Sequence, residues 1–161
     1  MPSTFLTTFR VDATVPIGHS LCGGWIRPAS KIGTPLFCDG LILQGPQAPI
    51  VLVAIDWTGI QNASHVEFTK AIAQASHTTP ERVALHCVHQ HNAPFIDATA
   101  QQLASKYREL PAIYDTGWLA EVQEKVCKAI AESLKMLEPV THINTGLSRI
   151  HGVASNRRII G

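Results

Sequence analysis

Short apolar runs separated by turn-forming residues fill the first third of the chain. Residues 5–11 alternate apolar and polar positions, which predicts a strand with one buried face. Residues 36–43 and 50–57 are apolar runs, and the glycine and prolines between them suit the turn of a β-hairpin. Because residues 50–55 are apolar at every position, we expect helices to cover this strand on both faces.

The next segment has the pattern of a βαβ unit. Asn62 or Ser64 is expected to cap a helix that ends near residue 75, and Ser64 and Glu67 have the spacing of a capping box. Residues 82–88 then predict a second strand. A strand, a helix and a strand within this span favour a parallel crossover. The sequence therefore predicts an α/β fold: a mixed sheet that contains a βαβ unit and is flanked by helices.

A long amphipathic helix is predicted in the last third of the chain, and Asp115 is placed to cap it. Its apolar stripe recurs every four residues, at Val122, Val126, Ile130 and Leu134. Pro139 ends this helix, and residues 141–150 predict one more strand. A shorter helix is expected at residues 98–108.

The glycine-rich segment 18–35 is expected to form a loop that packs over the fold, with Trp25 and Ile26 as its apolar anchors. The chain contains no internal repeat, low-complexity tract or linker. Its 161 residues suit one domain, so residues 1–161 are predicted to form a single α/β domain.

Composition excludes several classes of protein. Hydrophobic residues make up 45% and charged residues 16%, which is typical of a folded chain and not of a disordered one. Thirteen Lys and Arg against twelve Asp and Glu leave a formal charge of +1. A charge this small gives no field that attracts nucleic acid or anionic membranes, so no nucleic-acid partner is expected.

The sequence also bears on location. The longest strongly apolar stretch, residues 49–55, is far shorter than the roughly 20 residues that span a bilayer, so no transmembrane segment is expected. The first ten residues lack the basic start and apolar run of a secretory signal. These features predict a cytoplasmic protein.

Candidate chemistry gathers in the histidine cluster at the end of the second predicted strand. In an extended strand His89 and His91 share a face, with Cα atoms about 6–7 Å apart, so both imidazoles can reach one metal ion. His86 projects from the opposite face, which indicates a packing or surface residue. Ligands of α/β sheets bind beyond the carboxyl ends of parallel strands, where this pair is expected to lie.

Asp56 ends the first strand of the βαβ unit and is expected near the same sheet edge. It suits an oxygen ligand, or the acceptor that fixes a histidine tautomer. It equally suits a strand-end carboxylate that accepts backbone hydrogen bonds, and histidine pairs also occur as surface residues, so the spacing leaves both interpretations open. Near the end of the sequence, Arg157 and Arg158 follow Asn156 and can bind a carboxylate or another anion.

Several segments carry a resemblance to a known family. Val88-His89-Gln90-His91-Asn92-Ala93-Pro94 resembles the THTHSGP segment of the neutral, non-lysosomal ceramidases and their bacterial relatives. The segments at 10–18, 51–56, 79–83 and 152–158 are similar to that family's RxDITPPxG, VLVSLD, PPERV and GVxFNRR. The match is collinear over nearly the whole chain.

The resemblance implies an enzyme that hydrolyses the N-acyl amide of ceramide with one zinc ion. By position, His89 would be the metal ligand and His91 the catalytic neighbour that contacts substrate and the developing oxyanion, with Asn156 and Arg157 as substrate-binding residues. Zinc lowers the pKa of a bound water to about 7, which gives a hydroxide that can attack an amide carbonyl. The family's Ser-Gly is replaced here by Asn92-Ala93.

The family's other metal ligands, a histidine, a glutamate and a tyrosine, lie downstream of the segment at which this sequence stops. We therefore expect the N-terminal portion of a ceramidase-like, zinc-dependent amidase acting on a small or lipid-like N-acyl amide. The zinc site is then completed by further sequence, or is rebuilt from Asp56, His91 and a partner subunit.

Two alternatives remain open at this stage. One is a non-catalytic α/β module or truncated relic of that family that can act as a homo-oligomer. The other is a different metallohydrolase in which Asp56 completes the histidine pair within the chain.

Overall fold

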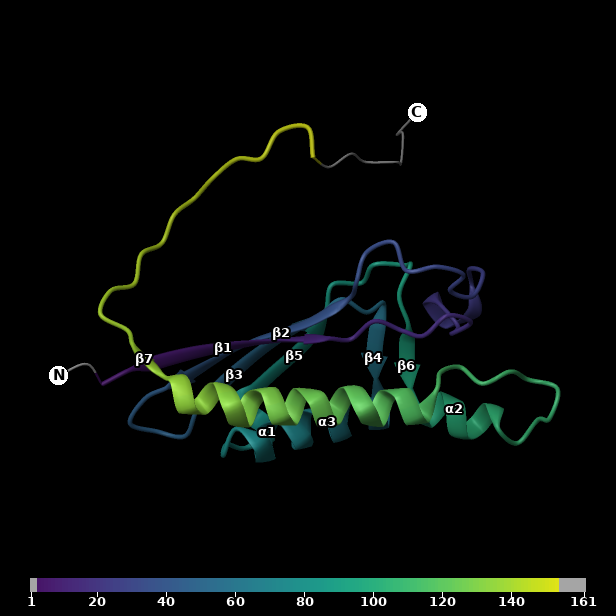
Figure 1. Cartoon of the computed structure of the whole chain (residues 1–161), viewed down its shortest axis with the longest axis horizontal. Helices are drawn as coiled ribbons and strands as arrows, with labels where there is room; N and C mark the ends of the chain where they lie inside the picture. The colour runs from purple at the N-terminus through teal and green to yellow at the C-terminus, as the bar shows by residue number, and fades with distance from the viewer. Residues whose placement is uncertain (1–2, 154–161) are drawn as a thin grey trace.

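A five-stranded sheet with two long helices on one face forms the centre of the computed structural model, which describes residues 3–153 (Figure 1). Its first three strands form an antiparallel meander: β1 (Phe5–Asp12), β2 (Phe37–Gln44) and β3 (Ile50–Ile55). The strands predicted from the apolar runs are confirmed, and the predicted glycine-proline turn joins β2 to β3.

The parallel crossover follows the meander. From β3 the chain passes through β4 (Gly59–Gln61) and α1 (Asn62–Ala75) to β5 (Val83–Cys87). β5 lies parallel to β3, in a register that runs from Val51↔Val83 to Ile55↔Cys87. The sheet order is β5-β3-β2-β1-β7, which confirms the mixed sheet, the βαβ unit and the α/β class.

Short elements complete the chain. β6 (Phe95–Asp97) pairs in parallel with β4 as a separate two-stranded sheet and leads into α2 (Ala98–Ala104). β7 (Glu138–Pro139) adds an edge to β1. The remaining pieces are the 3₁₀ turns η1 (Cys22–Gly24), η2 (Pro80–Arg82) and η3 (Leu134–Met136).

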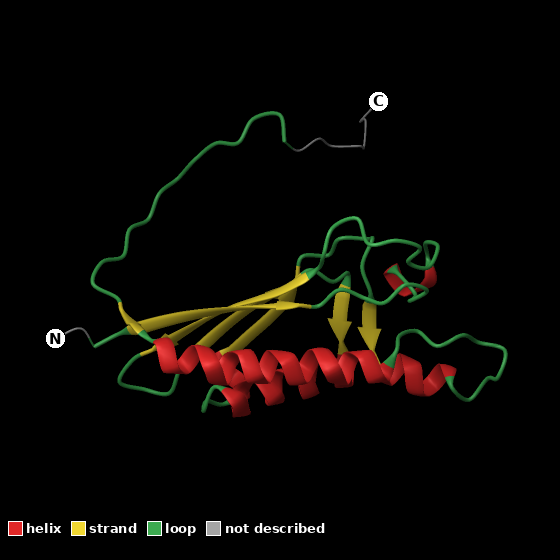
Figure 2. Ribbon diagram, viewed as in Figure 1, coloured by secondary structure: helices red, strands yellow, loops and turns green. Residues whose placement is uncertain are grey.

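α3 (Thr116–Ser133) and α1 lie side by side on the same face of the sheet (Figure 2). The predicted cap of α3 is confirmed, because the Asp115 carboxylate accepts a hydrogen bond of 3.0 Å from the Trp118 amide. The predicted stripe of α3 is also confirmed, since Val122, Val126 and Ile130 are buried. These residues close the core between helices and sheet.

The predicted capping box at the start of α1 is wrong. Gln61 is the residue that precedes the helix, and no side chain caps it. The Ser64 hydroxyl instead accepts a hydrogen bond of 2.8 Å from the Ala98 amide, and Asn62 donates to the Asp97 carboxylate at 2.7 Å. Tertiary contact with the start of α2 therefore uses the polar groups that local capping would need.

The expectation that helices cover β3 on both faces is also wrong for the described part of the chain. Both helices lie on one face, and the exposed fractions on the other face are 42% for Ile50 and 45% for Leu52. Continuous hydrophobicity along a strand therefore does not show by itself that helices cover both of its faces.

The strand predicted at residues 141–150 is wrong as well. β7 meets β1 only at Phe5 and Leu6, after which the Val140 amide donates to the Thr4 carbonyl. The chain then runs past the beginning of β1, so β1 offers no further residue to pair with. Residues 141–150 have no regular structure and extend away from the helices (Figure 1).

The loop between β1 and β2 packs over the fold as expected, but one of its predicted anchors is wrong. The side chain of Trp25 is 89% exposed, whereas Leu21 is buried. Trp25 therefore contributes little to holding this loop. Among the described residues, no helix combines the length and the apolar character that crossing a bilayer requires.

Candidate functional site

The histidine segment begins where β5 ends, at the carboxyl edge of the parallel pair β3 and β5. Hydrogen bonds continue just beyond the ladder, because the Val88 amide donates to the Ile55 carbonyl and the His89 amide donates to the Trp57 carbonyl, each at 3.1 Å. His89 then has a φ of 65°, in the left-handed region that few residues other than glycine adopt. The strand therefore does not extend through His91, as strand alternation would require.

This turn brings the two histidine rings together. The ring centroids of His89 and His91 lie 5.3 Å apart with an interplanar angle of 89°, and both residues are exposed. The expected proximity of the two imidazoles is present, although a backbone turn produces it and strand alternation does not. His86 is exposed on the uncovered face of the sheet.

A single hydrogen bond sets the tautomer of His89. Its Nδ1 atom lies 2.7 Å from the backbone oxygen of Thr58. Because a carbonyl oxygen only accepts hydrogen bonds, Nδ1 must carry the proton, and a neutral ring then keeps its lone pair on Nε2. A histidine that donates one ring nitrogen to a carbonyl and leaves the other free has the arrangement typical of metal ligands.

Thr58 forms hydrogen bonds along the histidine segment, and the sequence pattern did not predict this role. Its hydroxyl lies 2.6 Å from the Gln90 carbonyl and 2.9 Å from the Ala93 carbonyl, and its amide donates to the Pro94 carbonyl at 3.0 Å. The residue is only 3% exposed. The available signal was a hydroxyl residue just after a strand that ends at the candidate site. Thr58 is a positioning residue for His89.

Asp56 is held by the neighbouring strand. Its carboxylate accepts a hydrogen bond of 2.9 Å from the Phe37 amide, and its carbonyl accepts one of 2.8 Å from the Gln90 side chain. No hydrogen bond in residues 3–153 joins it to His89 or His91. Its geometry matches the strand-end carboxylate that the sequence left open, and a role as metal ligand stays a prediction.

The described residues do not form a complete zinc site. A catalytic zinc normally has three protein ligands and a water. Within residues 3–153, no group of three or more His, Cys, Asp or Glu side chains is placed to hold a metal ion. The histidine pair therefore does not complete a zinc site by itself. The predicted substrate-binding residues Asn156 and Arg157 lie outside the described residues.

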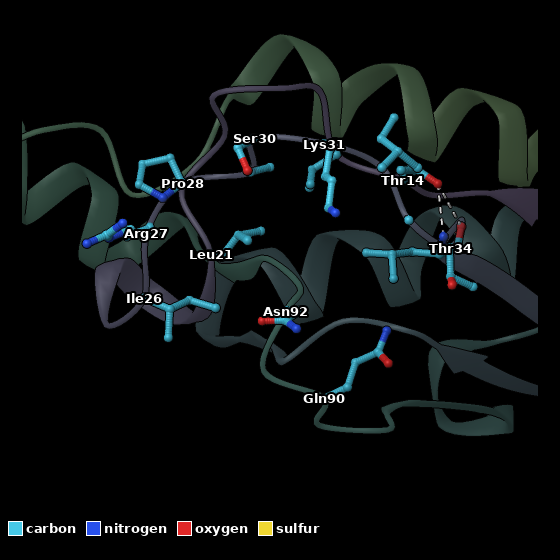
Figure 3. Close-up of a pocket in the computed structure, with 15 residues that line it drawn as sticks. Thr14, Leu21, Ile26, Arg27, Pro28, Ser30, Lys31, Thr34, Gln90 and Asn92 are labelled. Atoms are coloured by element: carbon cyan, nitrogen blue, oxygen red, sulfur yellow. Dashed lines mark hydrogen bonds between the residues drawn. The ribbon is translucent and has the colours of Figure 1, made fainter.

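A cavity of about 650 Å³ adjoins the histidine segment (Figure 3). The loop between β1 and β2 forms most of its wall, and Gln90 and Asn92 line it from the histidine segment. These two residues flank His91 in the sequence, whereas the cavity lining includes neither His89 nor His91.

The fold of this chain, a mixed sheet with two long helices on one face, is similar to the fold of part of solved ceramidases. One matching structure is the neutral ceramidase from Pseudomonas aeruginosa, with a TM-score of 0.62 and 14% sequence identity. Another is a ceramidase complexed with C2, with a TM-score of 0.60 and 14% identity. Each match covers 86% of this chain and 22% of the other chain.

This likeness confirms the fold that the sequence resemblance implied. The chain spans about a fifth of the length of the ceramidases that it matches. No family model matches the chain, and neither does any curated protein.

Proposed function

We propose that residues 1–161 are the N-terminal portion of a longer, ceramidase-like catalytic domain that hydrolyses an N-acyl amide with zinc. The observation that carries this proposal is the tautomer of His89, whose Nε2 is left free by the Thr58 carbonyl and stands beside a second imidazole. The structural match to neutral ceramidase over 86% of the chain supports it.

The chain's own residues have distinct roles in this proposal. His89 offers Nε2 to the metal, and Thr58 fixes the orientation of its ring. His91, whose ring centroid lies 5.3 Å from that of His89, is proposed to contact the substrate carbonyl. A zinc ion bound there would supply a hydroxide nucleophile and polarise the amide. Asn156 and Arg157 are proposed to bind the substrate.

Residues 3–153 of a single copy do not complete a metal site, so in this proposal the remaining ligands are supplied from elsewhere. Further sequence or a partner subunit could provide them. Light scattering of the full chain with and without zinc separates these sources, because ligands shared between two copies make the dimer fraction depend on zinc.

Zinc affinity tests the proposal directly. Competition with a chromophoric chelator is measured for the full chain, for His89→Ala and for His142→Ala, an exposed histidine in the segment that leaves the sheet. We expect His89→Ala to weaken zinc binding at least about tenfold and His142→Ala to leave it unchanged. If the native protein, including any sequence that follows residue 161, binds no zinc, the metal assignment is wrong.

A non-catalytic module or relic is the second candidate, and the lack of a complete set of metal ligands within the described residues favours it. Hydrolysis of an N-acyl amide by the isolated chain, at a rate abolished in His89→Ala, would exclude it. For a site completed by Asp56, the corresponding variant is Asp56→Ala. Unchanged zinc affinity in that variant would rule out Asp56 as a ligand.

The proposed compartment is the cytoplasm. The four free thiols support this location, because reducing compartments preserve unpaired cysteines. Fractionation of cells that express the native gene tests it, and recovery of the protein outside the cytoplasm would contradict it.

A further inference from the structure

The cavity beside the histidines has a polar floor and an overhanging loop. Gln90 and Asn92 form the floor on the histidine side, while residues 26–34 pass over it (Figure 3). His91 lies between these two floor residues in the sequence, so the cavity adjoins the histidine segment although neither His89 nor His91 lines it.

Part of the cavity wall is apolar. Val15, Leu21 and Leu36 are buried residues that line it, and Ile26 adds a half-buried side chain. Such a wall suits the hydrocarbon part of a ligand.

The charge of the lining has one sign. Arg27 and Lys31 are its charged side chains, and no carboxylate lines the cavity. The whole chain, by contrast, has nearly equal numbers of basic and acidic residues. The ion pairs found in residues 3–153 join Arg10 to Asp39 and Lys135 to Glu132, so neither cation of the cavity has a carboxylate partner there.

Lys31 extends into the cavity toward the floor, where Asn92 presents its carboxamide (Figure 3). The Gln90 side chain already has a hydrogen-bond partner within the protein, since its Nε2 donates to the Asp56 carbonyl. The Asn92 side chain forms no hydrogen bond within the described part of the chain, so an ammonium and an amide donor face the same space. This combination recognises an anionic oxygen.

We propose that this cavity binds a carboxylate on the amine side of the substrate, which makes the substrate an N-acyl amino acid. This inference rests on the proposed function. The carboxylate contacts Lys31 and Asn92, and the amide lies toward His91. Hydrolysis then breaks the C–N bond with one water: the acyl carbon gains the oxygen, and the amine of the released amino acid takes a proton.

Binding to the metal-free full chain tests the carboxylate site separately from zinc chemistry. N-octanoylglycine and N-octanoylethanolamine have similar size and differ in the carboxylate, and calorimetry after chelator treatment gives the affinity of each. We expect the carboxylate probe to bind about tenfold more tightly, because a hydrogen bond to a charged group contributes about the free energy of a tenfold change in affinity. This preference should fall as the salt concentration rises, because salt screens the charges.

Lys31→Met removes the charge while keeping the length of the side chain, and it should abolish the preference. Lys128→Met, on the exposed surface of α3, is the matched control and should retain it. Equal binding of both probes, no binding of either, or an unaffected Lys31→Met variant would each overturn the inference. Zinc binding that depends on His89 would in those cases still support an amidase for neutral amides.

Discussion

The backbone carbonyl of Thr58 lies 2.7 Å from Nδ1 of His89, and so one buried residue after β3 determines which nitrogen of an exposed imidazole is free. The hydroxyl and the amide of Thr58 also donate hydrogen bonds to backbone carbonyls of the histidine segment. The orientation of the site is thus set by the segment between β3 and β4, which precedes α1, although the histidines of the site follow β5, which comes after α1.

Replacement of Thr58 tests this positioning role. Thr58→Val keeps the side-chain shape but removes the hydroxyl that donates to the Gln90 and Ala93 carbonyls, of which the Ala93 carbonyl still accepts from the Cys22 amide. We expect the free energy of unfolding to fall by about 1–3 kcal/mol in urea titrations. We also expect zinc affinity to fall about tenfold, since residues that orient a ligand influence the metal. Thr58→Ser, which retains the hydroxyl, should behave as wild type. Loss of stability without loss of zinc affinity would show that Thr58 does not position His89.

Gly40 is a second position at which a small change should have a large effect. It faces Phe9 across the β1–β2 pair, and a Cβ atom there would overlap the Phe9 ring. Gly40→Ala should therefore lower the free energy of unfolding by about 1–3 kcal/mol through overpacking. Gly45→Ala is the control, because its added methyl group meets open space. Equal urea midpoints for the two variants would show that the Phe9 ring moves aside at no cost.

The exposed ion pair on the uncovered face of the sheet predicts a pH dependence. Arg10 binds the Asp39 carboxylate through two nitrogens, at 2.6 and 2.8 Å, and this hydrogen bonding lowers the pKa of Asp39 below its ordinary value. A lowered pKa in the folded state means that the pair stabilises the fold above about pH 4 and that this contribution disappears as the pH falls through the folded pKa.

Asp39→Asn should therefore reduce the urea midpoint slightly at neutral pH, and the difference from wild type should vanish as the pH falls below the lowered pKa of Asp39. Glu124→Gln, an exposed substitution on α3, should show no such pattern. A difference that grows toward low pH would contradict the assignment.

Two cysteines should be protected from thiol reagents in the folded state. Burial raises the pKa of Cys38 to about 12 and that of Cys87 to about 11, so neither is a thiolate at about pH 8. Alkylation followed by peptide mass spectrometry should find both unmodified in buffer and both modified in denaturant. Modification of Cys38 at the same rate in both conditions would contradict its burial.

The sequence predicts the elements of the core well because their periodicity is a direct result of burial. β1 alternates because one face packs on the helices, and the stripe of α3 repeats because Val122, Val126 and Ile130 meet the sheet. These are local patterns with one physical cause, so pattern alone is sufficient to recover them.

The failures share a different cause, which is dependence on a distant partner. Ser64 has the spacing of a helix cap, but its hydroxyl instead accepts a hydrogen bond from the Ala98 amide. Residues 141–150 have apolar positions typical of a strand, yet they lie beyond the first residue of β1 and have no neighbouring strand there. A strand requires a neighbour, and a single sequence does not reveal whether the neighbour is present.

The candidate site is intermediate between these cases. Spacing and the place of the histidines in the βαβ unit predicted that His89 and His91 would lie together, and their rings do. The left-handed backbone at His89 and the bonds from Thr58 could not be predicted, because they depend on how the end of β3 meets the segment after β5.

The pairing of Phe5 with Pro139 bears on the order in which the protein folds. The β1–β2–β3 meander forms from neighbouring segments, but its core face packs against α3, which is synthesised much later. Long-range contacts of this kind close slowly. A nascent chain therefore carries an apolar sheet face without its helix until α3 leaves the ribosome, and only then can β7 close the sheet edge against β1.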